Sequence, residues 1–164
     1  MNLLITYTLR IVVAASMLSC ATYPPQATLL TITTREESVV FQRSSEVTSF
    51  EVTAVLRNDD ARTLYVDSCF GETQREIDGV WTTVYLPFCL GATDMTIKPG
   101  DSVVLPITVR AFTTTPPTQP TLDPRMGAGR YRLLFGVDLK DPKQGPTDLN
   151  ERIAVPSSTF MVID

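Results

Sequence analysis

Apolar residues that recur at every second position constrain the fold of this chain more than any other feature of its sequence. The pattern is found in three stretches, 50–56, 103–109 and 131–137. Their apolar members are Phe50, Val52, Ala54 and Leu56; Val103, Leu105, Ile107 and Val109; and Tyr131, Leu133, Phe135 and Val137. A period of two buries one face of a strand and leaves the other in solvent, as in antiparallel sheets. Helical periodicity does not recur, so the sequence predicts an all-β fold.

Turn sequences separate these stretches. Asn58–Ala61 is rich in residues that bond to their own backbone, and Asp78-Gly79 is a strong hairpin signal between Arg75 and Tyr85. Lys98–Asp101 has the Pro and Gly positions of a type II turn. Further strands are expected at 29–34, 39–41, 63–66 and 159–163. We therefore predict about 7–9 strands in a single antiparallel β-sandwich, with a small closed barrel as the alternative.

Pro106 interrupts the series of backbone N–H donors in the predicted strand 103–109. A proline has no backbone N–H, so it is tolerated mainly on edge strands. The sequence therefore places this strand at the edge of its sheet.

Three motifs resemble bacterial immunoglobulin-like sandwich domains, a group that includes a protease-inhibitor-like subgroup. Val55–Asp60 with Thr63–Val66 looks like the B–C hairpin region of these domains, and Ile97–Asp101 looks like their turn into a late strand. Gly129–Leu133 looks like their Gly-x-Tyr strand start. The resemblance covers about residues 29–163 and implies the fold, but such a fold hosts many functions.

The N-terminus reads as a targeting segment. The apolar run 11–18 is much shorter than the roughly 20 residues that a spanning helix needs. Met17-Leu18-Ser19-Cys20 follows, and it resembles the lipobox of bacterial lipoproteins. We therefore divide the chain into a signal peptide, 1–19, a tether, 20–28, and an immunoglobulin-like domain, 29–164.

The lipobox resemblance implies cleavage before Cys20 and acylation of that residue. Several acyl chains anchor a protein stably, whereas one binds weakly. Ala21 stands where an Asp would resemble an inner-membrane retention signal, so the expected location is the outer membrane, facing the periplasm. Plain secretion and an uncleaved anchor are the alternatives.

Lipidation of Cys20 would leave one pair of cysteines, Cys69 and Cys89, in a compartment that permits disulfides. We predict a bridge between them, with two free buried thiols as the alternative. The chain has no C-x-x-C motif, which argues against a redox role.

The composition argues against several classes of function. The chain has no His, which removes Ser-His and Cys-His catalysis and His metal sites, and its net charge of −4 argues against nucleic acid as a partner. Asp59-Asp60 and the pair Asp138 and Asp141 are the main carboxylate pairs, and neither forms a calcium-loop series. We expect turn and solubility roles for them, no metal, no cofactor and no catalysis.

Two irregular segments and one aromatic group are the candidates for binding. Segment 113–128 is rich in Pro and Thr, and segment 141–158 lacks periodicity. Long loops of this kind are functional or disordered. Trp81 and Tyr85 are predicted to share one face of the hairpin with Thr83, and core and disulfide packing is the alternative explanation for these aromatic residues. The candidate partner-binding residues are Pro116, Pro117, Pro120, Trp81 and Tyr85.

These features predict a structural or protein-interaction module of the cell envelope. It would be held at the membrane through lipid on Cys20, would contact an envelope protein and would have no catalytic activity. The alternative is a peptidase-inhibitor-like domain that binds through the 113–128 loop.

Overall fold

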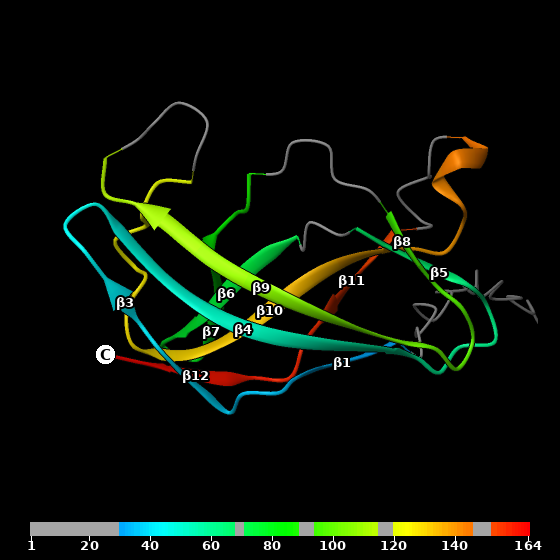
Figure 1. Ribbon diagram of the computed structural model, residues 1–164, viewed down its shortest axis with the longest axis horizontal. Coiled ribbons are helices and arrows are strands. Elements are labelled where there is room, and N and C mark those ends of the chain that lie inside the picture. The colour runs from blue at the N-terminus through cyan, green and yellow to red at the C-terminus, as the bar shows by residue number, and fades with distance from the viewer. Residues whose placement is uncertain (1–29, 68–70, 89–93, 115–119, 146–151) are drawn as a thin grey trace, which may run out of the picture.

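The computed structural model describes residues 30–67, 71–88, 94–114, 120–145 and 152–164. It shows two β-sheets packed face to face (Figure 1). The signal segment, Cys20, the cysteine pair, and Pro116 with Pro117 lie outside the described residues. Within that part of the chain no helix is long and apolar enough to cross a membrane.

The first sheet, sheet A, is built around one long strand, β4. Strand β9 runs antiparallel to it along one side through eleven residue pairs, and β1 and β3 share the other side. The bounds are β1 Leu30–Thr34, β3 Gln42–Arg43, β4 Val47–Asn58 and β9 Ser102–Phe112. The second side of β9 has no strand partner among the described residues, apart from one isolated bridge between Phe112 and Thr121. The position of Pro106 therefore agrees with the predicted edge strand.

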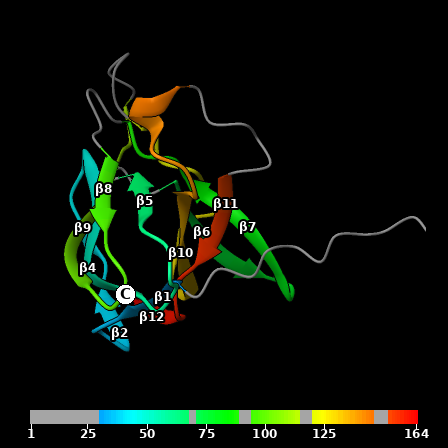
Figure 2. The same cartoon turned by 90° about the vertical axis from the view of Figure 1, so that its right-hand side faces the viewer.

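The second sheet, sheet B, is built around β10. Strands β12 and β11 follow one another along one side of β10, and β6 and β5 lie along its other side. Strand β7 flanks β6, β8 flanks β5, and β2 runs parallel to β12. The bounds are β2 Ser38–Val40, β5 Leu64–Asp67, β6 Glu72–Ile77, β7 Val80–Tyr85, β8 Asp94–Ile97, β10 Gly129–Asp138, β11 Arg152–Pro156 and β12 Phe160–Ile163. Figure 2 shows β4 and β9 on one side of the molecule and β10, β6 and β11 on the other.

The described residues contain twelve strand segments, more than the 7–9 predicted; two of the additional segments arise because two positions in sheet B are each occupied by two short strands in succession. The segment 141–158 was expected to be irregular, and this is wrong at two places. A 3-10 turn forms at Pro142–Gln144, and β11 pairs with β10 through five residues. Strand β11 is only five residues long, so its alternation of Ile153 and Val155 is too brief to stand out in the sequence.

The core lies between the inner faces of the two sheets. Phe50, Phe41, Tyr131 and Phe160 meet there, and the Phe50 ring centroid lies 5.5–5.9 Å from the other three. Aromatic rings at these separations and tilted orientations attract one another. The alternating apolar residues predicted to face the core in the stretches 50–56 and 131–137 are all buried, whereas Val103 and Leu105 are only partly buried at the start of β9.

The predicted B–C hairpin at 55–66 is wrong in one respect. Strands β4 and β5 belong to different sheets, so the chain crosses from one sheet to the other instead of folding back. The crossing is fixed by Asn58, which is fully buried. Its Nδ2 donates to the carbonyls of Arg62 and Ile97 at 2.8 and 2.9 Å, and its Oδ1 accepts from the Asp60 N–H at 2.9 Å.

Tyr131 supplies a further mark of the immunoglobulin-like fold. Its hydroxyl donates to the Gly127 carbonyl at 2.8 Å and accepts from the Gly127 N–H at 3.1 Å, four residues upstream. A tyrosine near the start of a late strand whose hydroxyl bonds to the backbone a few residues upstream is a hallmark of these sandwiches. The described strands form two separate sheets, so the chain is an immunoglobulin-like β-sandwich and the closed barrel is wrong.

Candidate partner-binding site

The segment 120–128 runs between the edge of sheet A and the edge of sheet B and is hydrogen-bonded to both. At the sheet A edge, the Phe112 N–H donates to the Pro120 carbonyl at 3.0 Å and the Leu122 N–H donates to the Phe112 carbonyl at 2.9 Å. At the sheet B edge, Arg125 Nη2 donates to the Thr83 carbonyl at 3.3 Å. This part of the predicted binding loop is therefore attached to both sheets.

Arg75 of β6 holds the end of the same segment. Its Nη1 and Nη2 donate to the carbonyls of Arg125 and Ala128, each at 2.6 Å. Gly129 leaves room for this guanidinium, since a Cβ at that position would lie 2.9 Å from Arg75 Nε. The φ of Gly129 is +153°, which also disfavours any other residue there. Met126 is buried in the core beside these contacts.

An ion pair stiffens the middle of the segment. Arg125 Nη2 lies 2.6 Å from Asp123 Oδ2, and Arg125 Nε lies 2.9 Å from Asp123 Oδ1. This bidentate contact holds the pKa of the Asp123 carboxyl below its ordinary value. The segment 120–128 is therefore preorganised, which lowers the entropic cost of presenting it to a partner.

A groove lies between this segment and the end of β7. We call it the Tyr85 groove; its lining residues are Thr83, Val84, Tyr85, Leu86, Pro120, Thr121, Asp123 and Arg125. Tyr85 is buried at its base, and its hydroxyl is hydrogen-bonded by the backbone of Arg110 on the β9 edge. Burial raises the pKa of Tyr85 above its ordinary value, so the hydroxyl is neutral at physiological pH.

Two large apolar side chains that closely follow Tyr85 in the chain are exposed, and one of them, Leu86, lines the groove. Leu86 is 61% exposed and Phe88 is 53% exposed. Exposed apolar side chains gathered beside a depression mark sites of protein or ligand contact. The groove thus combines an apolar rim with polar groups from a fixed segment.

The structure brings two of the predicted binding residues together and separates a third. Tyr85 and Pro120 line the groove, whereas Trp81 lies on the outer face of sheet B. The expectation that Trp81 and Tyr85 share a face is wrong. The ladder between β6 and β7 pairs Gln74 with Thr83 but Thr73 with Tyr85, so one extra residue, Val84, reverses the alternation. Such a bulge turns the following side chains to the other face, and Tyr85 points inward.

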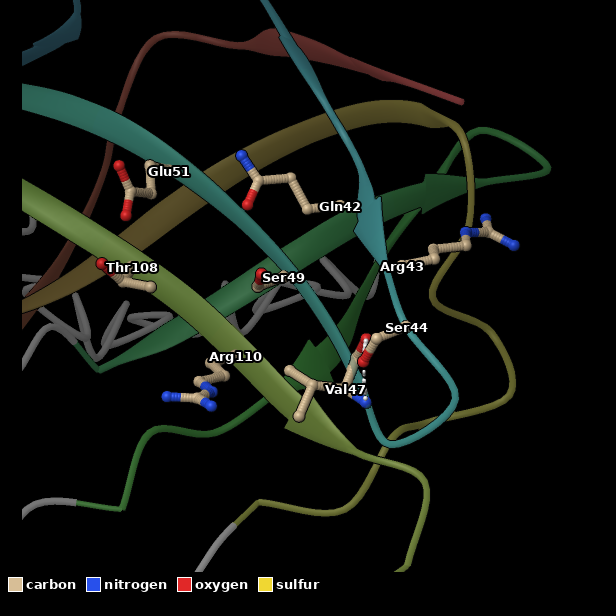
Figure 3. A pocket seen from close by; sticks show the side chains of 8 residues that line it. All are labelled: Gln42, Arg43, Ser44, Val47, Ser49, Glu51, Thr108 and Arg110. Carbon is tan, nitrogen blue, oxygen red and sulfur yellow. Dashed lines mark hydrogen bonds between the residues drawn. The ribbon is translucent and has the colours of Figure 1, made fainter.

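A second concavity of the described part of the chain lies on the outer face of sheet A (Figure 3). It is lined by Gln42, Arg43, Ser44, Val47, Ser49, Glu51, Thr108 and Arg110. Figure 3 shows Arg43 and Arg110 directed to opposite sides of it, and Arg43 is paired with Asp164 at 2.6 Å. The two cations do not converge on a common point, so this concavity is a weaker candidate than the Tyr85 groove.

The carboxylates have structural roles where the structure describes them. Asp60 pairs with Arg62 at 2.7 Å, and Asp141 caps the 3-10 turn by accepting from the Lys143 N–H. These roles agree with the predicted turn chemistry. No group of three or more His, Cys, Asp or Glu side chains in the described part of the chain is arranged to hold a metal ion.

Asp138 is the exception, because it is buried and its Oδ1 has no hydrogen-bond partner. Burial raises the pKa of its carboxyl above the ordinary value of 3.8; Arg152 opposes this rise, and Asp94 and Asp67 add to it. A raised pKa in the folded state means that ionisation of Asp138 lowers stability as the pH rises from the ordinary value through the folded-state pKa.

We therefore expect Asp138→Asn to be more stable than the wild type at pH 7, since the amide removes the ionised form. The advantage should shrink as the pH falls through the folded-state pKa, where the wild-type carboxyl becomes protonated. Urea unfolding of both proteins at pH 7 and at a pH near the ordinary value measures this difference. A variant less stable than the wild type at pH 7 would contradict the assignment.

Comparison with known proteins gives likenesses of fold. No family model matches the chain, and no curated protein does. The Northeast Structural Genomics Consortium target SoR45 is similar over 85% of this chain and 88% of its own, at 15% identity and a TM-score of 0.44. A PapD-like domain of human CEP192 is similar over 99% and 96%, at 14% identity and a TM-score of 0.39. The CARDB domain of PF1109 from Pyrococcus furiosus, solved with di-metal ions, covers 82% and 92%, at 15% identity and a TM-score of 0.26. Scores this low say nothing about function.

Proposed function

We propose that this chain is a protein-interaction module without catalysis, and that the Tyr85 groove is its contact surface. The observation that carries the proposal is the fixed segment 120–128 beside exposed apolar side chains. Backbone bonds to Phe112 and side-chain bonds from Arg75 and Tyr131 hold that segment on three strands. Loops held on a rigid sandwich commonly carry binding.

A photo-crosslinking amino acid at Phe88, in whole cells, tests this proposal. We expect a discrete crosslinked product with an envelope protein, and we expect Leu86→Asp to abolish it because a charge replaces an apolar contact at the rim. Leu86 is exposed, so the substitution leaves the core intact.

Val104→Asp is the matched control, since Val104 is also exposed, at 47%, but lies on β9 outside the groove. The product should persist in this variant. A product lost equally in both variants, or in neither, would show that the groove is not the contact surface.

Inhibition of a peptidase is the second candidate, favoured by one observation. The Pro120 carbonyl and the Leu122 N–H are both bonded to Phe112, which fixes the backbone around Thr121 as a strand-like stretch along the β9 edge. A fixed, strand-like backbone is the form in which many partners add to a sheet or a cleft. A panel of purified peptidases distinguishes the candidates: an inhibitor lowers turnover, whereas a simple interaction module does not.

Lipid anchoring through Cys20 belongs to the same proposal, supported by the short apolar run and the Ser19-Cys20 boundary. Labelled fatty acid fed to cells is expected to enter the wild type and not Cys20→Ala, because the acylated sulfur is then absent. Equal labelling of the two proteins would contradict the anchor. The expected location remains the outer membrane, facing the periplasm.

The bridge between Cys69 and Cys89 also stays a prediction, since both residues lie outside the described ranges. Neighbouring described residues support it. Asp67, two residues before Cys69, pairs with Asp94, five residues after Cys89. Thr73, four residues after Cys69, pairs with Tyr85, four residues before Cys89. A disulfide at this place would tie together two connections whose ends are already paired.

A further inference from the structure

A row of four side chains crosses the outer face of sheet B, and we call it the Trp81 row. In spatial order it consists of Met161 on β12, Arg130 on β10, Glu76 on β6 and Trp81 on β7. The ladders pair Met161 with Arg130 and Glu76 with Trp81, and Arg130 Nη1 lies 3.2 Å from Glu76 Oε2. The four residues therefore form one continuous line across four neighbouring strands.

The row is accessible and has the composition of an interface. Met161 is 43% exposed, and the Arg130 side chain is 53% exposed. The Trp81 ring is half-buried beneath arginines, with the Arg132 guanidinium carbon 4.5 Å from its centroid and that of Arg130 at 6.0 Å. Trp, Arg and Met are enriched in protein interfaces, and Trp and Arg provide much of the binding energy there.

The order of the row makes it complementary to its own reversed copy. A two-fold axis that runs parallel to the strands, between β10 and β6, exchanges the two ends of the row. Arg130 then faces Glu76 of the other copy, and Met161 faces its Trp81. The neighbouring row on the same face contains Arg132 on β10 and Gln74 on β6, which are paired and hydrogen-bonded. The same two-fold axis would place this Arg132 opposite Gln74 of the other copy.

We propose that a second copy of this chain docks on the Trp81 row as a two-fold symmetric, face-to-face dimer. The Arg130–Glu76 pair of each copy would join that of the other in one four-membered ionic network, and each Met161 sulfur would contact an indole ring. The middle of the row carries one positive and one negative charge, so it matches its own reverse better than it matches a uniformly acidic or basic partner.

The size of the face sets the expected strength. Four strands at a spacing of about 4.8 Å span about 20 Å across, and the six residues of β6 and of β7 extend about 20 Å along the strands, although β12 contributes only four residues. Ile163 and Val40, paired at the neighbouring edge and both exposed, extend the face by an apolar margin. Such a face is at the small end of specific interfaces, so the dimer is expected to dissociate on dilution.

Sedimentation of the purified full-length chain over a range of concentrations tests the proposal. We expect a reversible monomer–dimer equilibrium, and a blue shift of the tryptophan emission as the concentration rises, since Trp81 is the one Trp of the chain. Glu76→Arg gives a row with two cations and Arg130→Glu gives a row with two anions, so each variant alone should be monomeric at concentrations where the wild type is dimeric.

Mixing these two variants is the decisive step. The all-cationic row of one meets the all-anionic row of the other, so an equimolar mixture should recover the dimer, and so should the double variant Glu76→Arg/Arg130→Glu. A circular dichroism spectrum like that of the wild type establishes that each variant is folded. A wild type that remains monomeric at every concentration, or a mixture of folded variants that does not dimerise, would overturn the proposal. None of the four residues of the Trp81 row lines the Tyr85 groove, so failure of the dimer proposal would leave the proposed partner site untouched.

Discussion

Phe50→Ala is expected to lower the free energy of unfolding by about 3–5 kcal/mol, the largest effect of any single substitution considered. Phe50 is fully buried between the two sheets. Its ring meets Phe41, Tyr131 and Phe160 with centroids 5.5–5.9 Å away, so truncation removes three aromatic contacts and leaves a cavity that rigid strands cannot close. Urea unfolding, followed by circular dichroism, measures the loss.

Phe88→Ala is the matched control, because the same atoms are removed from a side chain that is 53% exposed. Its free energy of unfolding should stay within about 0.5 kcal/mol of the wild type, as for most surface substitutions. Similar losses for the two variants would show that the aromatic cluster is not the centre of the core.

Asn58→Asp is expected to lower the free energy of unfolding by about 3 kcal/mol, although the two side chains have the same shape. The Asn58 amide donates to the carbonyls of Arg62 and Ile97, and a carboxylate cannot donate to either. Two buried acceptors lose their donor, and a charge enters a fully buried position. The Asn58 backbone also bonds with Gly100 and Asp101, so the residue joins the crossing between the sheets to the turn before β9.

The cost of Asn58→Asp should fall as the pH is lowered. Burial raises the pKa of a carboxyl, so the folded variant takes up a proton more readily than the unfolded one, and acid relieves the deficit. Urea unfolding at pH 7 and near pH 4 checks this trend. A deficit that grows in acid would mean that the position is not buried in the way described.

Much of the fold follows from local patterns in the sequence. The alternation in β4, β9 and β10 predicts their buried faces, because a strand with one wet and one dry face must place apolar residues at every second position. The turns at Asp78-Gly79 and at Pro99-Gly100 were predicted, and Asp78, Gly79 and Gly100 all have positive φ. In such turns the backbone demands particular residues, so the sequence is informative.

The parts that were missed depend on contacts between distant residues. Strands β8 and β11 are four and five residues long, too short for their alternation to be distinctive. The inward turn of Tyr85 depends on a bulge opposite Thr73 and Gln74, and nothing local to Val84 signals it.

The candidate site was predicted only in part. Pro120 and Tyr85 were identified separately, but their proximity results from the docking of the segment 120–128 along β9 and β7. Leu86 and Arg75 were not predicted to contribute to the site. The spacing of residues does not reveal that the Leu86 side chain is exposed. It also does not reveal that the Arg75 guanidinium donates to carbonyls about 50 residues away in the chain. The Gly-x-Tyr motif was the one available signal, since Tyr131 fixes the corner that closes the segment.

Amide hydrogen exchange on the free full-length chain tests most directly whether the proposed binding segment is formed before a partner arrives. The Leu122 N–H donates to Phe112, the Met126 N–H to Asp123 and the Gly127 N–H to the Tyr131 hydroxyl. We expect all three amides to be protected from exchange, as strand amides are, because they are bonded within a fixed segment. Exchange of these amides at the rate of an unstructured peptide would contradict a preformed Tyr85 groove.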